Sequence, residues 1–459
     1  MKYITISRLI PFLVLAVIAC AAVFIPSISN LKDAGVNSAD TAFIIVATAL
    51  VFLMTPGLAF FYGGMVHRKN VISTMIKSVV AAGVVSVLWI TVGYSLCFGE
   101  SIGNPFTHLF FKNVSSGAAS LQGGPALTIP LLLFAMFQLM FAIITPGLVV
   151  GAVAERIKFS AYILFIVLFS LFVYAPLAHW TWHPKGFLNS MGVLDFAGGT
   201  VVHISAGCAA LAGALVLKRR QSHLENKEIP PANIPYVLIG TGLLWFGWFG
   251  FNAGSALGAN MLAVSAFATT NTAAASAGLS WMFFDVLKGK KPSVLGFCIG
   301  AIVGLVAITP GAGFVAIPQS IFIGFIAAII SNIAVHYKSK SSLDDTLDVF
   351  PCHGIGGMVG MILTGVFATK TVNAGGADGL FYGNPTFFFI QLKGLAIVVA
   401  YSFTVSFAIF KFINFILPIR VTKQDELLGL DVTQHNENYT QGTLLVQNGD
   451  VFKETLVEN

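Results

Sequence analysis

Charge is the property that this chain has least of. Asp, Glu, Lys and Arg together make up 10% of its 459 residues, whereas about 25% is usual for a soluble domain. Hydrophobic residues make up 56%, and the mean hydropathy is +0.85. So little charge excludes an ordinary soluble domain and indicates a protein that crosses a membrane many times.

Motifs of several enzyme classes are also missing. The chain has no Walker loop, no Gly-x-Ser-x-Gly motif and no Cys-x-x-Cys pair, so neither an ATP-driven pump nor a hydrolase is indicated. All of its cysteines lie in apolar segments, which favours small core residues over a disulfide framework or a metal site. We therefore expect no catalytic activity and no cofactor. The cysteines are Cys20, Cys97, Cys208, Cys298 and Cys352.

Apolar runs of the roughly 20 residues that span a bilayer recur along the chain. They predict an all-α polytopic membrane protein with eleven transmembrane helices. We place the spans near residues 42–62, 74–98, 128–150, 159–178, 198–217, 235–252, 261–286, 293–310, 315–336, 354–368 and 387–416.

Basic residues gather after every second span. Because Lys and Arg are enriched in cytoplasmic loops, the first span is expected to begin outside and the tail, residues 421–459, to lie in the cytoplasm. These loops account for the net charge of +6, so no nucleic-acid partner is indicated. The residues are Arg68, Lys69, Arg156, Lys158, Lys218, Arg219, Arg220, Lys227, Lys288, Lys290, Lys291, Lys338, Lys340, Arg420 and Lys423.

The N-terminus resembles a secretory signal peptide over residues 1–29. Lys2 and Arg8 precede an apolar run that ends near Phe24, and Ser27 and Ser29 sit where a signal peptidase needs small residues. We favour cleavage there, since an exported first helix end requires export of the segment before it. The alternative is an uncleaved additional helix.

The membrane domain, residues 30–420, is interpreted as two five-helix halves and one extra helix. Each half opens on a helix rich in Gly and aromatic residues, at 55–64 and 245–255, and ends on a helix that carries a histidine. Five crossings are an odd number, so the halves enter the membrane from opposite sides. Such inverted repeats place the site of a transporter at their interface near the middle of the membrane.

Those two histidines, His203 and His353, are the strongest functional candidates. An ionisable group at bilayer depth is costly and usually faces a cavity or pathway. Each histidine follows an aspartate, Asp195 or Asp348, and precedes a helix rich in small residues. A pair at matching places predicts a polar strip that passes a small solute or a proton. A structural role in the bundle, or a metal site short of ligands, is the alternative.

Two further groups have an open interpretation. Asp195 is either the N-cap of its helix or a fixed negative charge near the outer mouth. Aromatic residues near the outer ends of spans either belong to the membrane-interface belt or bind a cation through their ring faces. Ser255, one turn beyond Phe251, could add a hydrogen-bond acceptor. The aromatic residues are Phe137, Phe141, Trp180, Trp182, Trp248 and Phe251.

The segment from Asp195 to Arg220 resembles the signature of the ammonium transporter (Amt/Mep/Rh) family. It begins Asp195-Phe-Ala-Gly-Gly-Thr-Val-Val-His203 and continues through a helix of small residues. Shorter similar segments, which extend the resemblance over essentially the whole chain after the signal peptide, are Phe60-Phe-Tyr-Gly-Gly64, Gly151–Ser160, Gly247–Ser255, Asp348–Gly354 and Gly429-Leu-Asp431.

The resemblance implies a homotrimer of eleven-helix subunits, each with its own pore. It makes His203 and His353 the twin pore histidines that line the route of ammonia or relay a proton. The outer ammonium site would consist of Phe141, Trp182 and Ser255. Phe141 and Phe251 would form the gate, and Asp195 would be the aspartate needed for transport. Trp182 together with Ser255 is more similar to the Amt branch than to the Rh branch.

Bacterial members of the family carry a tail motif that couples subunits and binds PII-type signalling proteins. Here the tail reads Gly429-Leu-Asp-Val-Thr-Gln-His-Asn436-Glu-Asn-Tyr439, with Asn436 in place of the usual glycine.

The resemblance also implies a multi-pass protein of the cell inner membrane, which is surrounded by lipid and serves nitrogen utilisation. We expect an ammonium transporter. A membrane ammonium sensor with little flux is the alternative, and it usually carries an appended signalling domain.

Overall fold

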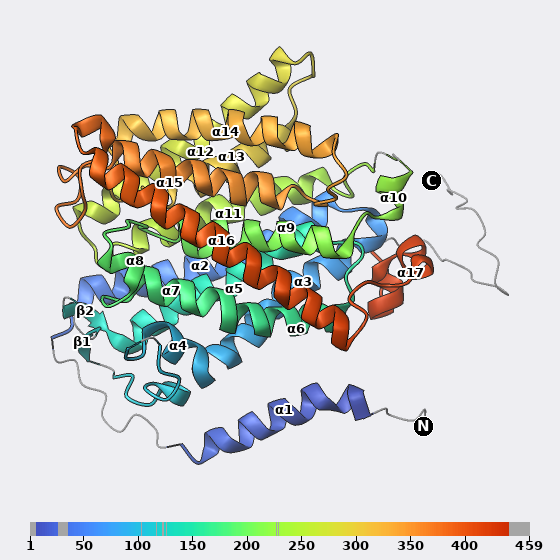
Figure 1. Cartoon of the computed structure of the whole chain (residues 1–459), viewed down its shortest axis with the longest axis horizontal. Coiled ribbons are helices and arrows are strands. Elements are labelled where there is room, and N and C mark those ends of the chain that lie inside the picture. The colour runs from blue at the N-terminus through green and yellow to red at the C-terminus, as the bar shows by residue number, and fades with distance from the viewer. Residues whose placement is uncertain are drawn as a thin grey trace.

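Each of the eleven expected spans corresponds to a helix in the computed structural model, which describes residues 6–25, 35–101, 103–115, 117–121, 124, 126–225, 227 and 229–439. Among these residues, nine helices are long and apolar enough to cross a membrane, and the 27-residue α12 and 15-residue α13 complete the eleven. They run side by side as one bundle (Figure 1). The chain is therefore an all-α polytopic membrane protein.

The first half contains five spans, of which two are interrupted by a short π-helical turn and one begins with such a turn. Its elements are α2 (Ser38–Met65), α3 (Val71–Leu88), η2 (Trp89–Gly93), α4 (Tyr94–Phe98), α5 (Leu131–Val153), α6 (Phe159–Phe169), η4 (Ser170–Tyr174), α7 (Ala175–Trp182), η5 (Gly199–Ile204) and α9 (Ser205–Leu217).

The second half again contains five spans and is followed by one long extra helix. Its elements are α11 (Ile234–Gly254), α12 (Met261–Leu287), α13 (Val294–Ile308), α14 (Ile317–Ser339), η6 (Phe350–Ile355) and α15 (Gly356–Phe367), and the extra helix is α16 (Pro385–Ile416).

Short elements occupy the two ends of the bundle. A small hairpin, β1 and β2, lies at one end, and α10 and α17 lie at the other (Figure 1). Residues 128–130, expected to be helical, belong to β2, and α5 begins only after Pro130. Proline has no backbone N–H to donate to a preceding turn, so a helix does not extend through this residue toward the N-terminus. The short elements are η1 (Arg68–Asn70), η3 (Leu109–Phe111), β1 (Ala118–Ser120), β2 (Ala126–Pro130), α8 (Phe187–Ser190), α10 (Gln221–Leu224), η7 (Leu380–Tyr382), α17 (Lys423–Leu428) and η8 (Asp431–His435).

Side-chain caps define where several spans begin. Asn37, Asn233, Asn260 and Ser293 each accept a hydrogen bond from a backbone N–H in the first turn of the helix that follows. The first N–H groups of a helix have no partner inside it, and at a membrane surface an unsatisfied group is expensive. The caps therefore set the helix ends near the two faces of the bundle.

The neighbour pattern confirms the two repeats. α2 packs on α3 and α5, as α11 packs on α12 and α13, and α5 packs on α9 as α13 packs on α15. The first helices of the halves, α2 and α11, contact each other, and α9 contacts η6 while α15 contacts η5. The ends of both halves thus meet at the centre of the bundle. A side chain at Gly207 would collide with the backbone of Gly354, so glycine is what lets these helices approach.

The N-terminal helix α1 (Ile6–Val23) stands apart from the bundle (Figure 1). Its apolar residues are exposed, among them Phe12 and Val17 at 68% each. Cys20 is exposed with them, so the expectation that every cysteine lies in the core is wrong for this one; the other four are buried. Ser27 and Ser29, the candidate cleavage residues, lie outside the described residues, and the signal peptide stays a prediction.

The tail docks on the first turn of α3. The Asp431 carboxylate accepts hydrogen bonds from the Ile72 N–H at 3.1 Å and the Ser73 N–H at 2.7 Å. The ammonium of Lys77, itself buried, donates to the Ser73 carbonyl at 2.9 Å. A carboxylate is favoured at a helix N-terminus, and here it also lies near a buried positive charge.

The last described residue of the tail, Tyr439, contacts the start of α11. The Tyr439 hydroxyl accepts a hydrogen bond of 2.9 Å from the Asn233 amide. Between these anchors Asn436 has φ 57°, the left-handed conformation that glycine and asparagine adopt most readily. Asn436 in place of the usual glycine is therefore compatible with the docked tail. Residues 440–459 lie outside the described residues.

Replacing Asp431 with Asn should loosen the tail. The amide lacks the negative charge that the helix N-terminus and Lys77 favour, a loss of about 1 kcal/mol or about fivefold in tail release. Trypsin cleavage at Lys423 in the purified protein should accelerate accordingly. Asp378→Asn is the matched control, because this carboxylate also accepts two hydrogen bonds but lies in the loop before α16. Equal cleavage of both variants and the parent would contradict the assignment.

Candidate functional site

The two candidate histidines face each other inside the bundle. Their ring centroids are 5.6 Å apart with the planes tilted by 33°, and both side chains are buried. They border a narrow cavity with room for about one water-sized molecule, roughly 10 Å³. Within the described residues, neither ring nitrogen of His203 has a hydrogen-bond partner, nor does Nδ1 of His353. The other lining residues are apolar: Met54, Leu58, Phe61, Ile144, Leu148, Leu244, Trp248, Phe251 and Ile302.

Aromatic rings close this cavity toward the end of the bundle that carries β1 and β2. Phe141 of α5 and Phe251 of α11 lie with centroids 4.3 Å apart at 39°. His203 stacks on the other side of Phe251 at 5.8 Å, and on Trp248 at 5.2 Å. The two phenylalanines therefore separate the histidines from the space beyond, as a gate would.

That space is a pocket of about 140 Å³, and it brings together the residues expected at the outer site. Trp182 and Phe141 form a T-shaped contact with their ring centroids 5.8 Å apart. The Ser255 hydroxyl donates to the Phe251 carbonyl at 2.8 Å, which leaves its lone pairs available as acceptors. The lining residues are Leu121, Phe134, Phe137, Gln138, Phe141, Trp182, Phe196, Ser255 and Leu257.

Not every aromatic residue noted in the sequence belongs to this pocket. Trp248 lines the histidine cavity beside His203 and donates its indole N–H to Thr309 at 2.9 Å. Trp180 packs on Phe187 and Tyr401 instead.

Gln138 is a pocket residue that the sequence did not bring to attention. It is 8% exposed, and among the described residues its Oε1 has no hydrogen-bond partner. Its position one residue after Phe137, on a helix whose only other polar side chain is Thr145, was the available signal.

Asp195 acts as the cap of the helix that carries His203. Its carboxylate accepts hydrogen bonds from the N–H groups of Gly198 at 2.8 Å and Gly199 at 2.7 Å, and from both the N–H at 2.7 Å and the hydroxyl of Thr200. Its own carbonyl accepts from the Trp182 indole at 3.2 Å. One residue thus orients both the first turn before His203 and a wall of the outer pocket.

The second half has the same device, but its aspartate is Asp345 rather than Asp348. Asp345 lies eight residues before His353, as Asp195 lies eight before His203, and accepts from the N–H groups of Val349 at 3.1 Å and Phe350 at 2.7 Å. Asp348 instead has φ 58° and forms an ion pair of 2.7 Å with Lys338. Burial raises the pKa of Asp345 to about 6, although Lys338 opposes the shift. The equal spacing was the signal, and pairing His353 with the nearer Asp348 overlooked it.

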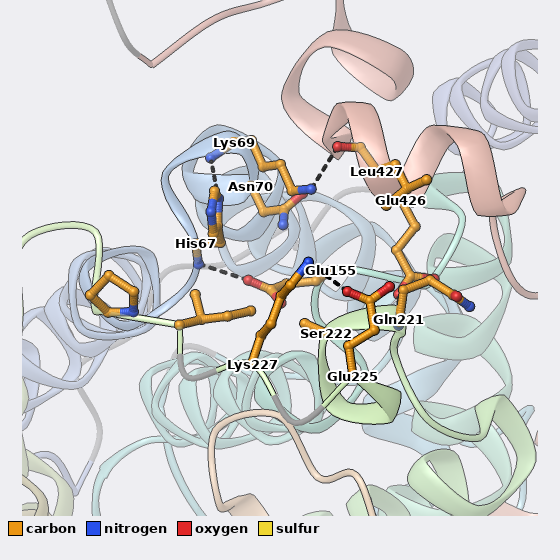
Figure 2. A pocket seen from close by; sticks show the side chains of 12 residues that line it. His67, Lys69, Asn70, Glu155, Gln221, Ser222, Glu225, Lys227, Glu426 and Leu427 are labelled. Carbon is orange, nitrogen blue, oxygen red and sulfur yellow. Dashed lines mark hydrogen bonds and ion pairs between the residues drawn. The ribbon is translucent and has the colours of Figure 1, made fainter. Parts of the chain in front are cut away.

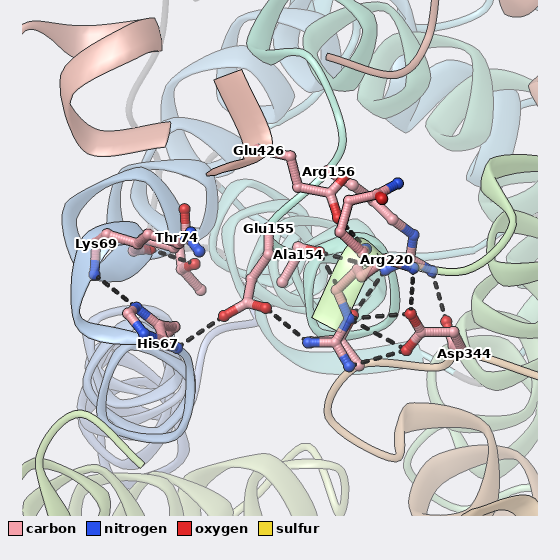
Figure 3. Close-up of polar contacts among 12 residues, drawn as sticks. His67, Lys69, Thr74, Ala154, Glu155, Arg156, Arg220, Asp344 and Glu426 are labelled. Atoms are coloured by element: carbon pink, nitrogen blue, oxygen red, sulfur yellow. Dashed lines mark hydrogen bonds and ion pairs between the residues drawn. The ribbon is translucent and has the colours of Figure 1, made fainter. Parts of the chain in front are cut away.

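A polar network joins the two halves at the opposite end of the bundle. Arg220, after α9, binds Glu155 at 2.6 Å and Asp344 at 2.8 Å, and Glu155 also accepts from the His67 N–H at 2.7 Å (Figure 3). Burial opposes the ionisation of both carboxyl groups, but the neighbouring arginines outweigh it and lower the pKa of Glu155 and of Asp344. The network is therefore charged, and both carboxylates are paired with Arg220.

Arg220→Met should destabilise the protein strongly. It leaves Glu155 and Asp344 buried without a cation, which costs about 3–5 kcal/mol, and we expect a lower midpoint of thermal unfolding in detergent. Lys227→Met is the control, because its ion pair with Glu225 is exposed and such pairs contribute little. If both variants unfold at the temperature of the parent protein, the network does not join the halves.

Comparison with known proteins supports the resemblance seen in the sequence. The model of the Ammonium Transporter Family matches residues 42–440. An ammonium transporter of Aquifex aeolicus is 48% identical over 417 residues, which cover 90% of this chain and 95% of that protein. An ammonium transporter of Bacillus subtilis is 46% identical over 408 residues, covering 88% and 99%.

Solved structures agree with these relatives. The crystal structure of Candida albicans Mep2 superposes with a TM-score of 0.78 at 37% identity, over 85% of this chain and 88% of that one. A structure titled "Sensor Amt Protein" gives 0.78 at 29% identity, over 86% and 98%. With an eleven-helix bundle, a matching family model and relatives near half identity, the chain belongs to the ammonium transporter family.

Proposed function

We propose that this protein is an ammonium transporter that binds ammonium outside the Phe141–Phe251 gate and conducts ammonia past His203 and His353. The observation that carries the proposal is the order of spaces along the bundle. An aromatic pocket, a pair of stacked rings and a narrow apolar cavity beside two facing histidines follow one another. Relatives at 46–48% identity are named ammonium transporters.

Ammonium is recruited in the outer pocket. The ring faces of Phe141 and Trp182 attract a cation by about 2 kcal/mol or more each once water is excluded. Ser255 accepts a hydrogen bond from one N–H of the ion. The unpartnered Oε1 of Gln138 can accept a second, so this amide is a further binding residue in the proposal.

The ion does not cross the gate with its charge. Moving a bare cation into an apolar medium costs tens of kcal/mol by Born estimates, whereas ammonia is neutral. Deprotonation therefore takes place at the pocket, and ammonia enters the apolar cavity. There the free ring nitrogens of His203 and His353 offer a donor and an acceptor to the passing molecule, and as a pair they can relay the released proton.

Asp195 supports both steps. Its capping bonds hold the turn that leads to His203, and its carbonyl holds the Trp182 indole. Its carboxylate also places a negative charge behind the pocket, which favours a cation there. The structural and the electrostatic role are thus combined in one residue.

The remaining parts of the proposal concern the assembly. The protein forms a homotrimer in the lipid of the cell inner membrane, where it serves nitrogen utilisation, with the first span beginning outside and the tail in the cytoplasm. The docked tail is the surface for a PII-type protein. A membrane ammonium sensor is the second candidate, because one structural relative is titled a sensor; that relative is less similar in sequence than the named transporters.

A current measurement separates the two candidates. In proteoliposomes of the purified protein, ammonium should elicit a saturable current that Asp195→Ala abolishes and Asp40→Ala retains. Asp40 is the matched control because its exposed carboxylate also accepts a backbone hydrogen bond, from Ala259. If no current flows, a pH-jump assay of ammonia flux distinguishes an electroneutral channel from a protein without flux, and absence of both would favour the sensor.

The histidines are tested by His203→Ala and His353→Ala. Each variant removes one side of the polar strip, so transport should fall by about 10²-fold or more if proton transfer passes through the pair, while the elution of the assembled protein from a size-exclusion column stays unchanged. Ile302→Ala is the control for opening the same cavity without removing a polar group. Unchanged transport in both histidine variants would refute the pore assignment.

A further inference from the structure

A second cavity, separate from the pore, lies between the docked tail and the body of the protein. Its volume is about 350 Å³, within the range of small-molecule sites, and it shares no lining residue with the pore cavity. Figure 2 shows its side chains converging from η1, α10 and α17. They belong to His67, Lys69, Asn70, Glu155, Gln221, Ser222, Glu225, Lys227, Ile229, Pro230, Glu426 and Leu427.

One wall presents a positive charge without a charged partner. The Lys69 ammonium donates to the Leu427 carbonyl at 2.7 Å, and among the described residues no carboxylate lies within ion-pair distance of it. Its backbone is held on both sides, since the Lys69 N–H donates to His67 at 3.3 Å and Gly429, with φ 106°, packs directly on the Lys69 side chain. The ammonium is therefore fixed at the junction of tail and body.

The lining also presents two buried carboxylates. Glu155 binds Arg220 and the His67 N–H, while Glu426 binds Arg420 at 2.7 Å and the Gln221 N–H at 2.6 Å. A carboxylate has about four acceptor positions, so each keeps capacity for a further donor. The positions of both groups are set by bonds that do not involve a ligand.

The rim can rearrange. Glu225 and Lys227 form an ion pair of 2.6 Å, but their side chains are 47% and 71% exposed. Exposed pairs of this kind are weak, so either partner can turn toward a ligand. Ile229 and Pro230 add an apolar surface beside the pair.

The charges decide which chemistry fits. Burial lowers the pKa of His67, which favours the neutral imidazole. Two lysines and three glutamates line the cavity, and Arg220 and Arg420, which are not part of the lining, pair with Glu155 and Glu426. The lining thus presents charges of both signs, and not the cluster of cationic side chains that a phosphate or other polyanion would need. Among the described residues no group of three acidic, His or Cys side chains could hold a metal ion. A molecule that carries one charge of each sign is complementary to both walls.

We propose that this cavity binds a small zwitterion of the α-amino acid type. Its carboxylate pairs with Lys69, its ammonium faces Glu155 and Glu426, and its side chain lies along Ile229 and Pro230. Because Glu426 and Leu427 belong to the tail and the other residues to the body, a bound molecule links the two. Ligand binding and tail docking then stabilise each other by linkage.

Calorimetric titration of the full-length protein in detergent tests the binding. The probes are the twenty protein amino acids one at a time, with succinate and butylamine as molecules of a single charge sign. At least one amino acid should bind saturably, and both single-sign probes should bind at least about tenfold more weakly, because each leaves one charged wall without a partner.

Lys69→Gln should weaken the binding of the amino acid at least about tenfold. Lys290→Gln, which removes an exposed lysine paired with Asp285, should leave this binding unchanged. The bound amino acid should also slow trypsin cleavage at Lys423, a readout that an unrelated site would leave unchanged. The proposal fails if no amino acid binds up to about 10 mM. It also fails if a single-sign probe binds as well, if Lys69→Gln binds normally, or if the tail is not protected. None of these results depends on transport.

Discussion

Two buried carboxylates hold the arrangement on which the rest of the histidine cavity depends. Asp195 and Asp345 satisfy the free N–H groups that precede the π-helical turns carrying His203 and His353. Inside a membrane protein these N–H groups have little water with which to form hydrogen bonds. Each helix can therefore begin within the bundle only because a side chain caps it. The caps place the histidines face to face, and the close approach at Gly207 and Gly354 keeps them there.

Around this centre the polar residues are concentrated at the ends of the bundle. At one end a pocket of rings and a few acceptors stands outside the Phe141–Phe251 pair. At the other, Arg220 joins two loops of the first half to the segment before η6. The tail is tied to the same end through Asp431 on α3 and Glu426 beside α10. The tail and the Arg220 network therefore meet at adjacent residues, because Gln221, which donates to Glu426, directly follows Arg220.

Much of the fold was predictable because composition and hydropathy report it directly. The eleven spans, their division into two repeats, and the pairing of the two histidines follow from apolar runs of sufficient length and from two ionisable residues where none is expected. The outer-site residues Phe141, Trp182 and Ser255 came from resemblance to a family, and the structure brings them together in one pocket. Gln138 was missed because a single glutamine on a largely apolar helix forms no repeating sequence pattern. Trp248 was expected near the outer end of its span, but it lies beside His203, because a helix boundary does not reveal which turn lines the cavity.

The sequence by itself determined the class, the number of crossings and the residues that could carry chemistry, since these depend on local length, composition and spacing. Only the tertiary structure decided which aspartate caps the helix of His353, which aromatic rings meet, and that Lys69, Glu155 and Glu426 surround one cavity. Those residues lie up to 357 positions apart in the chain, and no local pattern relates them. Their contacts arise where the two repeats pack against each other and where the tail docks on the body of the protein. Such contacts depend on tertiary packing and not on the local helix propensity of the sequence.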